Sequence, residues 1–391
     1  MNQSSMNAIL IFTAYGPPSA VNTFFFILTF LVYLITILAN LFLALVIIME
    51  PSLQKPMYVF MLHLAINGVI GSTSVCPKIM DLLISSTKES SYEGCLGQVF
   101  FINFYASSAY AILTAMAYDR YVSICKPLQY HTIMTSGKVK QLVFVIYFFP
   151  ITALSTQVYL TSKLPLCKNN INKLFCDNLA IVNLSCVKSN LGNIFGIFII
   201  IFLVVLPLIL VVISYIKILA VCLKTSKDAQ KKALSTCTPH LITFVNFSIA
   251  SLFSVIYNRF NDYIPSHVNF FMSLHFILLP PLLHPLIYGI RTLEIRKCIA
   301  KILRKRENHS VADYSLKFRT LAEQSGWNET SLLVNFRHEL NPRIQAELQY
   351  QGEALESMQI YPHQMVVPVE YQDPQEVFSK EQAVVLPAHR P

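Results

Sequence analysis

The sequence predicts an all-α membrane protein built around a bundle of seven transmembrane helices. Of its 391 residues, 54% are hydrophobic and only 13% are charged, whereas a soluble domain carries about a quarter of charged residues. Seven stretches of the chain reach the roughly 20 mostly apolar residues that a helix needs to cross a bilayer. The net charge of +9 comes from Lys and Arg scattered through short connections, so we expect membrane lipid around the chain and no nucleic-acid partner.

The seven predicted spans differ in how clearly the sequence marks them. The fifth is the clearest, because Ile194 to Ile213 contains no charged residue. The second and seventh contain prolines and polar groups, which neighbouring helices can accommodate inside a bundle. No inverted copy of the first half is visible. The predicted spans are Asn22 to Met49, Met57 to Ile84, Gln98 to Cys125, Lys138 to Leu160, Leu191 to Leu219, Leu234 to Tyr257, and Val268 to Ile290.

The short loops predict the orientation, because Lys and Arg accumulate on the cytoplasmic side of membrane proteins. The loop after the first span has Lys55, the loops after the third, fifth and seventh spans each carry several Lys or Arg residues, and the N-terminal segment contains neither. We therefore expect an extracellular N-terminus and a cytoplasmic C-terminus. The first 20 residues lack the charged start of a signal peptide, so the first span would act as a signal anchor. Glycosylation sequons begin at Asn2 and Asn183, both on the predicted outer side.

The nine cysteines fit this orientation. Four lie on the oxidising outer side and can form two disulfides in three ways: Cys95, Cys167, Cys176 and Cys186. Cys76 lies inside the second span, and the others lie near the inner side as expected free thiols: Cys125, Cys222, Cys237 and Cys298.

A pair of opposite charges, Asp119 and Arg120, closes the third span. A charge at that depth is costly unless it is paired, so the pair is a candidate functional site. The alternative is a helix end with ordinary interfacial charges. The residues that follow decide between these readings, because Met116-Ala-Tyr-Asp-Arg-Tyr-Val-Ser-Ile-Cys-Lys-Pro-Leu-Gln-Tyr130 resembles the same stretch of odorant receptors.

Further motifs carry the same resemblance, to odorant receptors of the rhodopsin-like G-protein-coupled receptor family. They cover residues 20 to 306, and Asn67-Gly68 and the sixth span are most similar to fish-type members. The motifs are Pro56-Met57-Tyr58, Pro77-Lys78, Ser214-Tyr215, Lys231-Lys-Ala-Leu-Ser-Thr-Cys-Thr-Pro-His-Leu241 and Pro285-Leu-Ile-Tyr288.

The resemblance implies roles for particular residues. Cys95 would pair with Cys176, which leaves Cys167 with Cys186. Arg120 would be held by Asp119 at rest and released toward the G protein on activation. The residues implied in coupling are Asp119, Arg120, Tyr121, Tyr215, Pro285 and Tyr288.

Two positions depart from the wider receptor pattern. Asn67 stands where an aspartate is usual, so it offers a sodium ion no formal charge. His284 stands where an asparagine usually precedes Pro285. A neutral histidine can still hydrogen-bond within the bundle, but a buried charged one would be costly and pH-sensitive.

We expect the ligand site between the outer halves of the third, fifth, sixth and seventh spans. The candidates on the third span recur at helical spacing and so share one face of the helix. The alternative is ordinary helix–helix packing, where small and hydroxyl residues are also common. The candidates are Val99, Asn103, Ala106, Ser107 and Tyr110 from the third span, Ile199, Ile200 and Leu203 from the fifth, and Phe247, Ser251 and Val255 from the sixth.

Two absences narrow the ligand. Ile102 stands where amine receptors carry a carboxylate, and Val268 to Ile290 contains no lysine that could hold retinal. We therefore expect a neutral or weakly polar odorant and no cofactor. No metal cluster, phosphate loop or nucleophile constellation is visible, so we expect no enzyme. The predicted function is an odorant receptor that activates a stimulatory G protein and raises cyclic AMP. The alternatives are a chemosensory receptor outside the nose, a transporter, and a signalling-impaired chimeric copy.

The sequence predicts four regions: an outer N-terminus (1–21), the receptor domain (22–290), a basic amphipathic juxtamembrane helix (291–306) and a cytoplasmic tail (307–391). Asp313 to Asn328, with Phe336 and Leu340, resembles the gag capsid region of gypsy-type LTR retrotransposons. Residues 370–391 resemble another segment of the same polyprotein. The tail is predicted to be a transposon remnant, joined by insertion or by gene prediction, with one or two short helices and disordered chain. A genuine regulatory tail is the alternative.

Overall fold

The computed structural model describes residues 8–187, 189–259, 266–292 and 294–301. The chain divides into two units, Met1–Arg304 and Lys305–Pro391, and the described residues all belong to the first. The expected tail helices and disordered chain, and the sequon at Asn2, lie outside the described residues.

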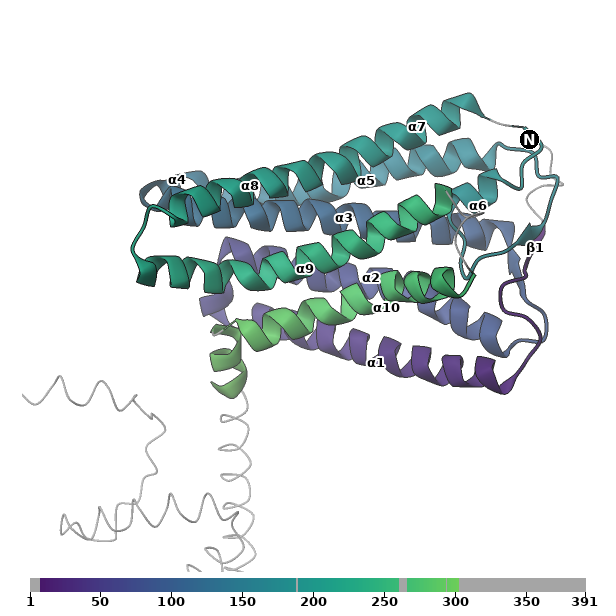
Figure 1. The fold of residues 1–391 in the computed structure, drawn as a ribbon, viewed down its shortest axis with the longest axis horizontal. Coiled ribbons are helices and arrows are strands. Elements are labelled where there is room, and N and C mark those ends of the chain that lie inside the picture. Colours follow the sequence, from purple (N-terminus) through teal and green to yellow (C-terminus); the bar gives the residue numbers. More distant parts are fainter. Residues whose placement is uncertain (1–7, 188, 260–265, 293, 302–391) are drawn as a thin grey trace, which may run out of the picture. The chain divides into compact units, whose positions relative to one another are not determined.

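The first unit is a bundle of long helices that lie side by side (Figure 1). Among the described residues, five spans are long and apolar enough to cross a membrane, and α9 and α10 complete the predicted seven. The fold class is therefore confirmed. The spans are α1 (Ala20–Met49), α2 (Pro56–Ile84), α3 (Tyr92–Cys125), α5 (Ser136–Ser162), the continuous α7 (Asn190–Ile200), η3 (Ile201–Val205) and α8 (Leu206–Cys222), then α9 (Lys227–Arg259) and α10 (Ser266–Arg291).

Local sequence explains where these helices begin. A helix leaves its first backbone N–H groups without partners, and a preceding Ser or Thr oxygen can accept from one of them. Ser19, Ser91, Thr135 and Ser189 do so at the starts of α1, α3, α5 and α7. Pro56 is the first residue of α2, where its missing N–H costs nothing. The polar residues between the apolar runs thus fix the boundaries.

Helix α3 is the centre of the bundle. It contacts α2, α5, α8 and α9, and 67% of its most apolar window is buried, against 11% for the α7–α8 span. The α7–α8 span therefore has most of its surface available to lipid. The π-helical turn η3 inserts an extra residue into that span and ends two residues before Pro207.

Close approaches and polar ties join α1, α2, α3 and α10. A Cβ added at Gly71 of α2 would lie 2.5 Å from the Tyr105 ring of α3, so only glycine fits there. The Asn67 amide donates to the Tyr105 carbonyl oxygen at 2.9 Å, and the Asn40 amide donates to the Pro281 carbonyl oxygen at 2.9 Å. Small residues and interhelical hydrogen bonds are the usual means of packing helices inside a membrane.

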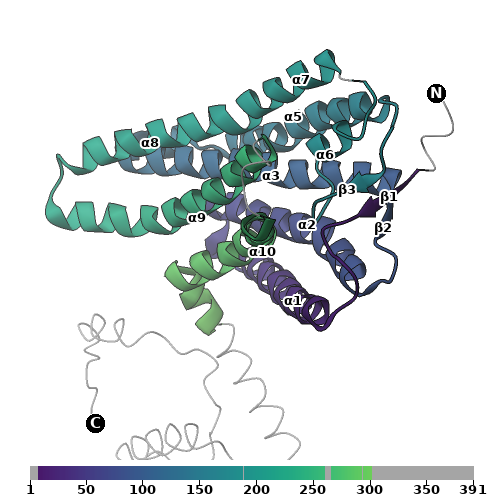
Figure 2. The same ribbon diagram turned by 45° about the vertical axis from the view of Figure 1, so that its right-hand side comes forward.

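One end of the bundle carries a three-stranded sheet that the sequence did not predict. Strand β1 (Ile9–Phe12) pairs antiparallel with β2 (Glu89–Ser91) and parallel with β3 (Asn170–Ile171), as Figure 2 shows. A short helix, α6 (Asn178–Val182), follows β3. The same end holds two disulfides, Cys95–Cys176 and Cys167–Cys186. We call it the disulfide end.

The opposite end holds the short elements that follow α1 and α3. These are η1 (Pro51–Leu53), η2 (Pro127–Gln129) and α4 (Tyr130–Ile133). Residues 294–301 are also helical, and Ile295 and Cys298 of this helix are buried while Arg296 and Lys297 are exposed. We call this the Arg120 end. Residues 302–306 of the expected juxtamembrane helix lie outside the described residues.

Candidate functional site

At the Arg120 end, Asp119 and Arg120 form an ion pair within the last two turns of α3. The Arg120 Nη2 group donates to Asp119 Oδ2 at 2.8 Å. The Asp119 side chain is fully buried, whereas the Arg120 side chain keeps 19% of its surface. A buried carboxylate needs a partner, and removing that partner typically costs about 3–5 kcal/mol. Removing Arg120 from Asp119 would therefore leave a buried, uncompensated carboxylate and destabilise the folded state.

Tyr130 completes this cluster from outside the helix. Its hydroxyl donates to Asp119 Oδ1 at 2.7 Å, so each carboxylate oxygen has one donor. Burial, and then the hydrogen bond to Asp119, raises the pKa of Tyr130 above its usual value. The phenol is therefore protonated, and able to donate, throughout the neutral range. Tyr130 is the last residue of the motif at the end of the third span, but the sequence pattern assigned no role to it.

A second link joins α8, α9 and α3 through His240. The Tyr215 hydroxyl lies 2.5 Å from His240 Nδ1, and His240 Nε2 lies 2.9 Å from the Leu113 carbonyl oxygen. A carbonyl can only accept, so Nε2 carries the proton and Nδ1 accepts from Tyr215. His240 is fully buried. It belongs to the motif that ends at Leu241, and a histidine inside the predicted sixth span was the signal that could have identified it.

The remaining coupling candidates surround this link. Arg120 is close enough to the phenols of Tyr215 and Tyr288 to interact with both electrostatically. Tyr288 is 1% exposed and Pro285 is buried one turn before it in α10. The Tyr121 ring faces the Lys217 ammonium at 5.6 Å. The sequence-predicted coupling residues thus gather at the Arg120 end, on α3, α8 and α10.

The two departures from the wider pattern are both buried. Asn67 is fully buried and its Oδ1 has no hydrogen-bond partner among the described residues. His284 is 1% exposed, and neither of its ring nitrogens has a partner there. Its ring centroid lies 6.3 Å from that of Phe247. Burying an imidazole without hydrogen-bond partners lowers the stability of the fold, so His284 is a destabilising residue at this position.

The ligand candidates fall into two groups. Tyr110, Phe247 and Ser251 meet in the core, where the Tyr110 hydroxyl lies 2.5 Å from Ser251 Oγ and the two aromatic rings are 4.9 Å apart. On α3, Val99 and Ser107 are buried and Ala106 is half-buried, and Leu203 is half-buried in η3. Val255 lies in α9, but its side chain is outside the described residues.

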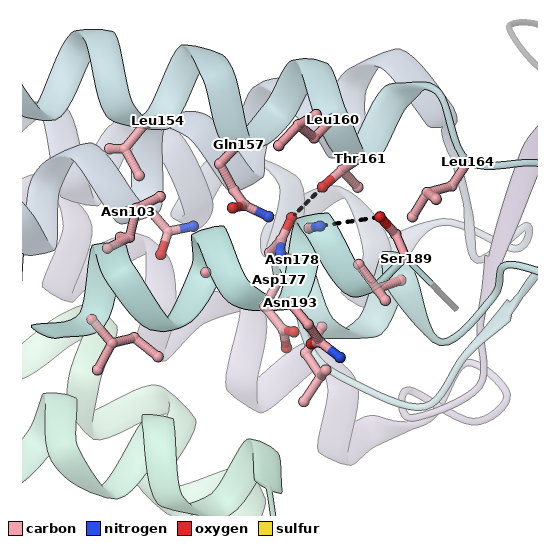
Figure 3. Close-up of a pocket in the computed structure, with 16 residues that line it drawn as sticks. Asn103, Leu154, Gln157, Leu160, Thr161, Leu164, Asp177, Asn178, Ser189 and Asn193 are labelled. Carbon is pink, nitrogen blue, oxygen red and sulfur yellow. Dashed lines mark hydrogen bonds between the residues drawn. The ribbon is translucent and has the colours of Figure 1, made fainter. Parts of the chain in front are cut away.

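The other group lines a pocket at the disulfide end (Figure 3). Asn103 of α3 and Ile199 and Ile200 of α7 were predicted ligand contacts, and they share this pocket with residues from α5 and α6. Its volume is about 190 Å³. Six further lining residues are polar and were not among the predicted ligand contacts: Gln157, Thr161, Asp177, Asn178, Ser189 and Asn193.

Gln157 and Thr161 come from α5, Asp177, Asn178 and Ser189 come from the segment between Cys167 and α7, and Asn193 comes from α7 itself. Gln157 is an amide near the end of a predicted span, which was a usable signal. The loop residues reach the pocket because the Cys95–Cys176 bond ties the loop to α3 and because Gln98 Oε1 accepts from the Cys176 N–H at 2.8 Å. Asn183, the second sequon, is exposed at the end of α6.

Comparisons with known proteins cover both parts of the chain. The family model described as olfactory receptor matches residues 29–306. The model of the PEG10/RTL1 C-terminal capsid-like domain matches residues 300–359, in line with the retrotransposon-like character of the tail.

Several curated human proteins are similar to the bundle. Olfactory receptor 52J3 is 36% identical over 277 residues, which is 70% of this chain and 89% of its own length. Olfactory receptor 52D1 is 36% identical over 274 residues, or 69% of this chain and 86% of its own length. Olfactory receptor 52B2 is 34% identical over 272 residues, or 69% and 84%.

Proposed function

This chain belongs to the olfactory receptor family, and on that premise we propose that it binds a small odorant and activates a heterotrimeric G protein. The odorant would bind in the pocket lined by Asn103, Ile199 and Ile200. The G protein would bind at the Arg120 end. The chain is accordingly a multi-pass plasma-membrane protein.

We further propose that the disulfide end faces the outside of the cell. Disulfides persist in oxidising surroundings, and the Arg120 end adjoins loops rich in Lys and Arg, as expected for the cytoplasmic side. The pocket would then open toward the compartment that supplies odorants. The G protein would meet Arg120 from the cytoplasm.

Helix α3 connects the two proposed sites. Asn103 and Arg120 lie on the same helix, and at 1.5 Å per residue they are roughly 25 Å apart along its axis. A ligand against Asn103 can therefore act on Arg120 by moving α3 relative to α8 and α9. Packed interfaces switch between discrete arrangements and do not deform continuously. The hydrogen bonds made by Tyr130 and His240 would therefore each be either intact or broken.

The observation that carries this proposal is the buried Asp119–Arg120 pair clamped by Tyr130. Such a pair has two states, closed on Asp119 or released toward a partner. Stimulatory coupling would raise cyclic AMP on odorant binding.

Replacing Arg120 tests the coupling. In Arg120→Ala the released arginine is missing, so we expect the odorant-dependent rise in cyclic AMP to disappear at matched surface expression. The measurement is cyclic AMP in cells challenged with an odorant panel. Lys140→Ala, which removes an exposed cation from α5, is the control and keeps the response. Wild-type output from Arg120→Ala would refute the role of the pair.

A further inference from the structure

One face of the helix of residues 294–301 packs against the segment that joins α1 to α2. Cys298 Sγ lies 3.8 Å from Ser52 Oγ, and Lys301 Nζ lies 3.6 Å from Glu50 Oε1. Ser52 Oγ also donates to Glu50 Oε1 at 3.3 Å. Residues three apart share a face of a helix, so Cys298 and Lys301 hold the same side of this helix against the α1–α2 connection.

Glu294 lies on that face too, four residues before Cys298. Its carboxylate interacts with the hydroxyl of Tyr58, the third residue of α2, and the same hydroxyl interacts electrostatically with Arg120. Tyr58 is 8% exposed, whereas Glu294 is exposed. Tyr58 therefore has a guanidinium and a second carboxylate in its surroundings, and water can reach that carboxylate.

The Arg120 guanidinium has donors to spare. It carries five N–H groups, and the hydrogen bond described for it runs from Nη2 to Asp119 Oδ2. Its Nε atom has no partner among the described residues. Asp119 therefore holds Arg120 through a single nitrogen instead of the two-point contact that makes arginine–carboxylate pairs strong, and 19% of the Arg120 side chain remains accessible.

Two other carboxylates described at the Arg120 end are less suited to receive this guanidinium. Glu50 is already paired with Lys301. Asp228 lies in the first turn of α9, nine residues before Cys237, a residue of α9 that interacts with Arg120. At 1.5 Å per residue this places Asp228 about 14 Å further along the helix axis.

We propose that Glu294 is the second acceptor of Arg120, so that the guanidinium released from Asp119 pairs with the Glu294 carboxylate beside Tyr58. This inference rests on the proposed function, because it names the group that receives Arg120 in the released state. A cation taken from a buried partner is costly unless another anion receives it. Exposed ion pairs are weak, so this second pair would ease the release of Arg120 without making it permanent.

The first test needs neither odorant nor G protein. It measures the melting temperature of the purified full-length receptor in a double-mutant cycle. Asp119→Asn keeps the shape of that side chain but removes its charge, which frees Arg120 to pair with Glu294. We expect Glu294→Gln to lower the melting temperature by about 2–4 °C more in the Asp119→Asn background than in wild type, as one exposed ion pair would. Tyr130→Phe supplies a milder background if Asp119→Asn does not fold.

Two further variants separate an acceptor from a structural anchor. Glu50→Gln is the matched control, because it removes the other carboxylate that holds the same helix. Its effect on the melting temperature should be equal in the two backgrounds. Glu294→Asp keeps the negative charge, so it should retain most of the coupling to Asp119→Asn.

The second test measures cyclic AMP in cells without odorant, at matched surface expression. Tyr130→Phe loses a hydrogen bond to Asp119 and so favours the released state. Adding Glu294→Gln should lower the cyclic AMP level of that variant roughly two- to fivefold, because the released state loses its acceptor. Adding Glu50→Gln should leave the level unchanged.

The two readouts distinguish this inference from the proposed function. Coupled melting temperatures without cyclic AMP from wild type or any variant support Glu294 as the second acceptor and refute the signalling. Additive melting temperatures overturn the role of Glu294, even where wild type responds to odorants and the proposed function stands. In a receptor that signals, a cyclic AMP level that Glu294→Gln does not lower, or that Glu50→Gln lowers equally, overturns it as well.

Discussion

At the scale of single residues, the Asp119 carboxylate joins the end of α3 to the short helix α4. Arg120 binds one oxygen and Tyr130 the other, and the side chain is fully buried. The two donors differ in kind, because Arg120 contributes a charge and Tyr130 a neutral hydroxyl from another element. Removing the hydrogen bond from Tyr130 therefore weakens the Asp119–Arg120 arrangement without removing either charge.

We predict that Tyr130→Phe raises cyclic AMP in the absence of odorant. Losing a hydrogen bond to a charged group costs about 1.5–3 kcal/mol, which destabilises the closed pair relative to the released one. Basal cyclic AMP at matched surface expression checks this, with Tyr159→Phe on exposed α5 surface as the control. Basal output equal to wild type would mean that Tyr130 does not restrain Arg120.

The same bond should be insensitive to pH in the physiological range. Tyrosine has an ordinary pKa of about 10, and burial and Asp119 raise the pKa of Tyr130 in the folded protein. A raised pKa means that the contribution to stability is fully present below about pH 10. It is lost only as the pH rises toward the higher value of the folded state.

At the scale of elements, the α2–α3 contact is the tightest approach described above. Gly71 faces the Tyr105 ring, which is 3% exposed and packs edge-on against Phe247 with centroids 5.9 Å apart. Phe276 of α10 lies 6.2 Å from the same ring. Tyr105 therefore cannot move aside without disturbing α9 and α10.

We predict that Gly71→Ala lowers the melting temperature of the receptor and its surface expression. The added methyl would lie 2.5 Å from the Tyr105 ring, and such overpacking costs typically about 1–3 kcal/mol. Thermal unfolding in detergent measures the effect. Gly97→Ala in α3 is the matched control, since nothing lies within 4 Å of its added Cβ. Equal melting temperatures for the two variants would contradict the tight contact.

At the scale of the whole molecule, the sequence predicted the membrane-spanning helices much better than the strands and loops that connect them. Apolar length alone defines a span, and the helices of the structure begin one to seven residues before the predicted starts, as α3 does at Tyr92 instead of Gln98. The sheet was missed because β1 has only four residues. Its partners are distant in sequence, and no local pattern encodes such pairing.

The site was predictable to the extent that its chemistry is unusual in a membrane. Asp119 and Arg120 are conspicuous because charges are rare in spans. Asn103 was predicted from helical spacing and Ile199 and Ile200 as an apolar wall, and all three line the pocket. The loop wall that contains Asp177 and Asn178 was not predicted. Those residues reach the pocket only through the fold of a disulfide-bonded loop, which sequence spacing does not give.

The tail gives a prediction for the molecule as a whole. The described hydrophobic core runs from Leu10 to Cys298, so a chain ending after residue 306 should respond to odorants with the same half-maximal concentration, within about twofold. A chain ending after residue 291 is the contrast. It also loses the helix that buries Ile295 and brings Lys301 to 3.6 Å from Glu50, so its surface expression should fall. A silent or constitutively active 1–306 chain would identify the tail as regulatory.

The sheet at the disulfide end also constrains the order of events on the ribosome. Strand β1 is synthesised well before β3, because Thr13, which directly follows β1, bonds to Ile171, 158 positions later. At about 5–20 residues per second, β1 waits roughly 8–30 s for that partner. Strand β2 becomes available after the first two spans, but the side of β1 that pairs with β3 stays unpaired until four spans have been made. That side of β1 is therefore an exposed β-edge until the loop that contains β3 is made.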